Sequence, residues 1–140
     1  MNIKISIKQI GSRKKGITEK DLSLEDVPHT TGELIEYTVH TCVNEYNQRV
    51  EKGEKITAPL TENDINTAGE IGKIAFGINY GGKKADMDKA VHDALLAYED
   101  GLFRIFINGL EAGKSDDRIE LSENDNVTFI RLTMIAGGMF

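Results

Sequence analysis

Residues 102–109 read LFRIFING, an apolar run of β-forming residues that ends in Asn-Gly, the strongest short signal for a β-hairpin turn. Residues 127–134, VTFIRLTM, form a second such run, which is partly apolar on both faces, as expected of a central strand. Between these two runs, residues 119–121, IEL, are predicted to form a short strand before a turn at 122–126. The C-terminal part of the chain is therefore predicted to be mainly strands.

Working outward, the first part of the chain predicts two more strands and the clearest helix. Ile3, Ile5 and Ile7 alternate with polar residues, which is typical of a half-buried strand, and residues 17–24 can return as the second strand of a hairpin. Thr30 with Glu33 fits a capping box at the start of a helix. The residues that follow form one apolar stripe at helical spacing: Leu34, Ile35, Val39, Cys42, Val43 and Tyr46.

The middle of the chain is patterned less sharply. Residues 59–62, PLTE, resemble a helix start, and the Gly-rich stretch 72–82 is predicted to be flexible. Residues 87–98 predict an amphipathic helix that ends at Asp100-Gly101. No linker or repeat separates these segments, so we expect a single domain over residues 1–140.

Composition and charge exclude several classes of function. The chain has 140 residues, of which 39% are hydrophobic, which fits one globular domain. Seventeen basic and 23 acidic residues give a net charge of −6, which argues against nucleic-acid binding and against binding to anionic membranes. The basic cluster Arg13-Lys14-Lys15 is expected at a solvated hairpin tip. No apolar run approaches the roughly 20 residues of a membrane span, and no signal peptide is recognisable, so we expect a cytoplasmic protein.

The order of the predicted elements is strand, strand, long helix, inserted helical segment, strand, Asn-Gly turn, short strand and final strand, followed by Gly137-Gly138. This order resembles the β-grasp or ubiquitin-like fold, an α+β fold in which a mixed sheet packs on a long helix. Over roughly the last 40 residues the pattern is similar to small sulfur-carrier proteins, namely the thiamine sulfur carrier and the small subunit of molybdopterin synthase. The resemblance implies that residues from about 53 to 101 are a helical, Gly-rich insertion. The matching stretches are 107–109, 119–121 with Asp125, 127–129 and 136–138.

The resemblance implies two functions. The first is a non-enzymatic ubiquitin-like protein that acts through protein partners as an adaptor or binding module, using a sheet face, a sheet edge or the inserted helices. The alternative is a sulfur carrier or modifier, in which an adenylating partner enzyme activates the carboxylate of Gly138. The chain continues with Met139 and Phe140, so this alternative also needs a protease that removes them. Otherwise Gly137-Gly138 is a bend that returns Phe140 to the sheet.

A distant third reading is a small-molecule or enzymatic site at the Gly-rich stretch. Residues 77–83, GINYGGK, match the first seven positions of a phosphate-binding loop, but the eighth is Lys84 where Ser or Thr would hold magnesium. We therefore predict no nucleotide site and no cofactor.

Metal, thiol and carboxylate chemistry is not predicted either. Glu36 and His40 share a helical face, but neither His29 nor His92 adds a second ligand cluster, so no metal site is expected. Cys42 lies on the apolar stripe and is expected to be buried and unreactive. The remaining candidates are expected to bend the chain in turns rather than to catalyse: Asp116, Asp117 and Asp125.

Overall fold

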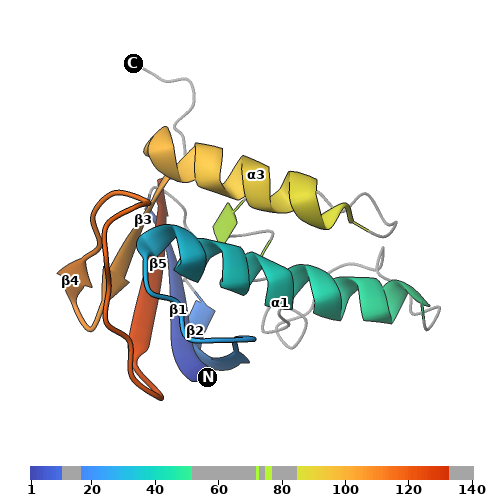
Figure 1. Ribbon diagram of the computed structural model, residues 1–140, viewed down its shortest axis with the longest axis horizontal. Helices are drawn as coiled ribbons and strands as arrows, with labels where there is room; N and C mark the ends of the chain where they lie inside the picture. Colours follow the sequence, from blue (N-terminus) through green and yellow to red (C-terminus); the bar gives the residue numbers. More distant parts are fainter. Residues whose placement is uncertain (11–16, 52–71, 73–74, 77–84, 133–140) are drawn as a thin grey trace.

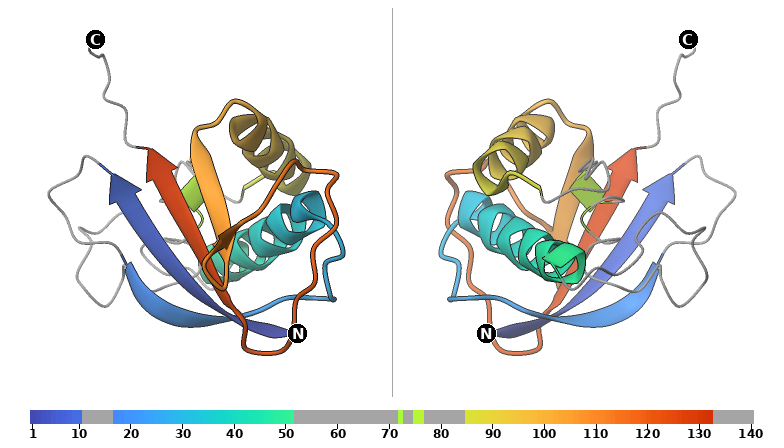
Figure 2. Two further views of the ribbon diagram at one scale, coloured as in Figure 1. Left: turned by 90° about the vertical axis from the view of Figure 1, so that its left-hand side faces the viewer. Right: turned by 90° about the vertical axis from the view of Figure 1, so that its right-hand side faces the viewer.

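The computed structural model describes residues 1–10, 17–51, 72, 75–76 and 85–132 (Figure 1). In these residues a five-stranded sheet packs against two helices, α1 (Thr31–Glu51) and α3 (Met87–Glu99). Both helices lie on the same face of the sheet (Figure 2). The strands are β1 (Asn2–Ile10), β2 (Ile17–Ser23), β3 (Phe103–Ile107), β4 (Leu110–Glu111) and β5 (Asn126–Leu132).

The sheet is mixed, with the strand order β2-β1-β5-β3-β4. β1 and β5 run parallel to each other, whereas the other neighbouring pairs are antiparallel. β5, the last of the described strands, is thus the central strand of the sheet, as its apolar composition predicts. The expected α+β class with a mixed sheet is confirmed.

Alternation of side chains explains how the strands build the core. Ile3, Ile5 and Ile7 are fully buried, in agreement with the period-2 pattern of the sequence. Phe103 and Phe129 come from the neighbouring strands β3 and β5 and are likewise buried on the helix-covered face. The return strand predicted for residues 17–24 is also confirmed, as β2.

The two helices follow the predicted signals. In α1, the Glu33 amide donates to Thr30 Oγ1 at 3.1 Å, and all six residues of the predicted apolar stripe are buried. In α3, Asp86 caps the first turn, and Gly101, with φ of +77°, ends the last turn, where Leu102 N donates to Ala97 O. The predicted hairpin turn is confirmed as well, because Asn108 and Gly109 both have positive φ between β3 and β4.

Two predictions about local structure are wrong. Residues 119–121 form no strand; the nearby chain makes only an isolated bridge between Thr30 and Arg118. Within the stretch 72–82, which was predicted to be flexible, the described residues Gly72, Ala75 and Phe76 are helical and buried. The high glycine content of the stretch favours flexibility, but these three residues are buried because Phe76 packs into the core. The rest of that stretch, like residues 59–62, lies outside the described residues.

The aromatic contacts of Phe76 show what the inserted segment contributes. Its ring lies edge-on to Phe103 and Phe129, with centroid separations of 5.3 and 5.2 Å. Arg131 of β5 also donates a hydrogen bond to Ala75 O. Part of the predicted insertion is therefore built into the same core as the sheet.

Candidate functional site

The sheet face that points away from α1 and α3 has no described helix over it (Figure 2). Strand side chains alternate between the two faces, so the neighbours of the buried core residues point outward. Ile130 occupies the middle of this surface, where it pairs with Lys8 on one side and with Arg104 on the other. We call the outward-facing group the outer patch, and it consists of Ser6, Lys8, Arg104, Phe106, Thr128 and Ile130.

The outer patch combines apolar and cationic side chains. Ile130 and Phe106 are only partly buried, whereas Lys8 and Arg104 are exposed. Arg104 Nη1 lies 3.7 Å from Glu111 Oε2, an exposed pair of little energetic weight. Lys8 has no ion pair within the described part of the chain. An apolar centre with cations beside it suits the docking of a protein surface.

The residues predicted to act in the carrier reading lie outside the described residues: Gly137, Gly138, Met139 and Phe140. The same holds for the basic cluster 13–15 and for the phosphate-loop-like residues 77–84. The last described residue before Gly137 is Leu132 of β5, which pairs with Ile10 of β1.

Cys42 is buried, as predicted, and burial raises the pKa of its thiol well above the ordinary value of 9.0. The turn aspartates also behave as expected. Asp117 Oδ2 accepts the Lys114 amide and Asp125 Oδ2 accepts the Ser122 amide, each at 2.8 Å. The structure therefore assigns these side chains to packing and to turns.

His40 makes one contact that sequence reasoning missed. Its Nδ1 lies against Glu25 Oε1, and its Nε2 is 3.7 Å from Glu36 Oε2. The spacing of four residues on a helix predicted that Glu36 lies beside His40. Glu25 is 15 residues away in the chain, so no local sequence pattern predicts its contact with His40. His29 and His92 are exposed. In the part of the chain that the structure describes, no set of three such side chains forms a candidate metal site.

The outer patch could not be identified from the sequence alone. The partly apolar character of both faces of residues 127–134 was the one signal that pointed to it.

Among the described residues, no helix is long and apolar enough to cross a bilayer. Comparison with known proteins found no matching family model, no matching curated protein and no matching solved structure.

Proposed function

We propose that this chain is a cytoplasmic β-grasp, ubiquitin-like protein that binds a partner protein through the outer patch and has no catalytic activity of its own. The strand order β2-β1-β5-β3-β4, with parallel central strands and α1 between β2 and β3, supports the β-grasp assignment. The observation that carries the functional proposal is Ile130, a partly buried apolar residue between two exposed cations on a face without a described helix.

The chemistry of the patch defines the expected partner. Ile130 and Phe106 would pack against an apolar side chain, and Lys8 and Arg104 would meet carboxylates at its rim. Central apolar anchors carry most of the binding energy in such interfaces, and rim charges contribute mainly to specificity and association rate. We therefore expect an acidic partner surface with an apolar centre.

The test is co-purification from the native cells, followed by binding measurements with the identified partner. Ile130→Arg adds a third cation to the patch and should weaken partner binding by roughly tenfold or more. The matched control is Leu96→Arg, which changes a 47% exposed leucine on α3, across the sheet from the patch. This control should bind as the wild type does. Loss of binding by Leu96→Arg with retention by Ile130→Arg would move the interface to the helices and contradict the proposal.

The carrier alternative is supported by the central place of β5 in the sheet and by the number of residues between Leu132 and Gly138. β5 is the central strand, and six residues lie from the end of β5 at Leu132 to Gly138, enough to extend roughly 20 Å beyond the sheet. Intact mass of the protein from native cells tests this function. A mass lacking Met139 and Phe140, with the gain left when sulfur replaces oxygen, would establish a trimmed, thiocarboxylated Gly138. A full-length mass would contradict the carrier function.

A further inference from the structure

A hollow of about 580 Å³ lies beside the hairpin of β3 and β4, and none of the residues of the outer patch lines it. β4 forms one side of the hollow, and residues 118–120 form the other. The chain reverses direction between the two sides in a turn, where Asp117 N donates to Lys114 O at 3.0 Å. The two sides therefore run in opposite directions, and the turn closes one end of the hollow.

Leu110 stands at the other, open end of the hollow, next to the hairpin turn. It is 77% exposed, more than any other large hydrophobic residue in the part of the chain that the structure describes. The remaining apolar lining comes from Ile107, Ala112 and Ile119, which pack against the core. A single exposed leucine needs no explanation, but this one projects directly beside an apolar hollow.

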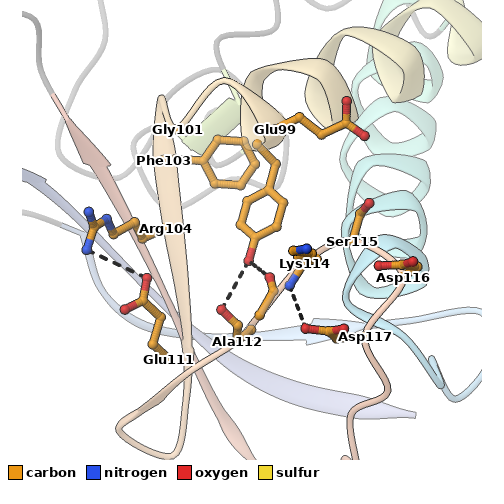
Figure 3. A pocket seen from close by; sticks show the side chains of 12 residues that line it. Glu99, Gly101, Phe103, Arg104, Glu111, Ala112, Lys114, Ser115, Asp116 and Asp117 are labelled. Carbon is orange, nitrogen blue, oxygen red and sulfur yellow. Dashed lines mark hydrogen bonds and ion pairs between the residues drawn. The ribbon is translucent and has the colours of Figure 1, made fainter.

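The closed end of the hollow is held in place before any ligand arrives. The Tyr98 hydroxyl donates to the carbonyl oxygens of Ala112, at 3.3 Å, and Gly113 (Figure 3). Within the turn, Asp117 Oδ2 accepts the Lys114 amide at 2.8 Å (Figure 3). A preformed wall lowers the entropy that is lost on binding.

The side of the hollow formed by residues 118–120 carries two opposite charges. Arg118 and Glu120 are exposed, whereas Ile119 between them packs against the core. Neither charge has an ion pair within the described residues. Glu111 also lines the hollow, but its Oε2 already lies 3.7 Å from Arg104 Nη1. The surface therefore offers one cation and one carboxylate that can each meet an opposite charge.

A two-fold axis matches this surface with itself. In such an interface both copies use the same patch, so residue i contacts residue j and j contacts i. Because the two sides run in opposite directions, Leu110 and Glu120 lie toward the open end, and Ala112 and Arg118 toward the closed end. An axis that crosses the hollow midway exchanges these ends. It brings Leu110 of each copy to the closed end of the other, and Arg118 opposite the other copy's Glu120.

We propose that this chain forms a two-fold dimer in which Leu110 of each copy enters the hollow of the other and Arg118 pairs with the second copy's Glu120. The occupant is a second copy because this one surface supplies both the apolar projection and the hollow, and both signs of charge. The dimer does not use the residues of the outer patch, so it is independent of the partner binding proposed above.

Sedimentation equilibrium of the full-length protein, from about 5 µM to about 500 µM, tests for the dimer. The patch is small, so we expect weak association, with a dissociation constant of roughly 10–100 µM. Leu110→Asp should weaken the dimer by roughly a hundredfold, because it places a charge in the hollow at two symmetric positions. The matched control is Leu96→Asp, which changes a 47% exposed leucine on α3 and should associate as the wild type does.

A charge exchange tests the geometry of the two-fold axis. Arg118→Glu and Glu120→Arg should each weaken the dimer by roughly tenfold, since each places two like-charged contacts in the interface. The double variant with both substitutions restores opposite charges and should associate within about twofold of the wild type. Both residues are exposed, so the fold should be retained, which circular dichroism checks.

An isotope-mixed sample locates the contact directly. When ¹³C-labelled and unlabelled protein are mixed in equal amounts, a filtered nuclear Overhauser spectrum reports only contacts between copies. We expect cross-peaks between the Leu110 methyl groups and the Ala112 methyl group, and none at Ile130.

Several outcomes would overturn the proposal. A protein that stays monomeric at the highest concentration, or a dimer that survives Leu110→Asp, would exclude the interface. Failure of the double charge variant to restore association would exclude the two-fold pairing. Association that is lost in Ile130→Arg and kept in Leu110→Asp would place the dimer on the outer patch. A monomeric chain that captures a foreign protein, but not after Leu110→Asp, would assign the hollow to that protein.

Discussion

Cys42 illustrates at the scale of one residue how burial determines the chemistry of a side chain. The thiol is fully buried, and desolvation is the largest cause of its raised pKa. The charge of Glu45 raises the pKa further, whereas a hydrogen bond with the Gly72 backbone opposes the shift. The thiol therefore stays protonated in the folded protein at pH values where an exposed thiol ionises.

This pKa shift predicts a loss of stability at alkaline pH. The folded protein holds the Cys42 proton more tightly than the unfolded chain, so the stabilisation is fully present below pH 9.0 and is lost as pH rises above it. Between pH 9 and pH 10 the wild type should lose about 1 kcal/mol more unfolding free energy than Cys42→Ala. Urea unfolding of both proteins at each pH measures the difference, and parallel losses would contradict the raised pKa.

At the scale of elements, the start of α1 is held by a reciprocal cap. Thr30 Oγ1 accepts the Glu33 amide at 3.1 Å, while Glu33 Oε1 accepts the His29 amide at 2.8 Å. In a capping box the second bond goes to the amide of the cap residue itself, so here it has moved one residue toward the N-terminus. The cap lies next to the bridge between Thr30 and Arg118, and it thus supports both the helix and the segment after β4.

Removal of the cap should destabilise the protein moderately. Thr30→Ala leaves the Glu33 amide without its acceptor and should cost about 1 kcal/mol, lowering the melting temperature by roughly 3–5 °C. Thr30→Ser is the matched control, because it keeps the accepting oxygen and should melt close to the wild type. Calorimetry measures both variants. Equal losses for alanine and serine would show that the methyl group, rather than the cap, stabilises this position.

At the scale of the whole molecule, Phe76 joins the inserted segment to the core of the sheet. Phe76→Ala should reduce the unfolding free energy by roughly 3–5 kcal/mol, because it leaves a cavity against Phe103 and Phe129. The segment and the sheet share one core, so the protein should unfold in one cooperative transition. Phe76→Ala should move this whole transition to lower urea concentration. Circular dichroism and tyrosine fluorescence, followed during urea unfolding, should give coincident curves.

Leu110→Ala serves as the control for this experiment, because Leu110 is 77% exposed and its truncation should change stability by less than about 0.5 kcal/mol. A separate early transition in Phe76→Ala that left the sheet signal unchanged would contradict the expectation of one domain over residues 1–140.

The elements themselves were predictable to different degrees. The Ile3 to Ile7 alternation and the Asn108-Gly109 turn predicted their structures correctly, because side-chain period and turn conformation depend on neighbouring residues. Residues 119–121 had strand-like composition but formed no strand. There the Ile119 amide donates instead to His29 O, a partner 90 positions away that no local pattern reveals.

The features of the candidate sites were also predictable from the sequence to different degrees. The sequence by itself determined the strand and helix faces, the net charge of −6 and the buried place of Cys42, since each follows from composition or from local periodicity. Only the tertiary structure placed Ile130 between Lys8 and Arg104 and brought Phe76 into the core. These arrangements depend on which distant segments pair and pack, and local propensity carries little information about such long-range contacts.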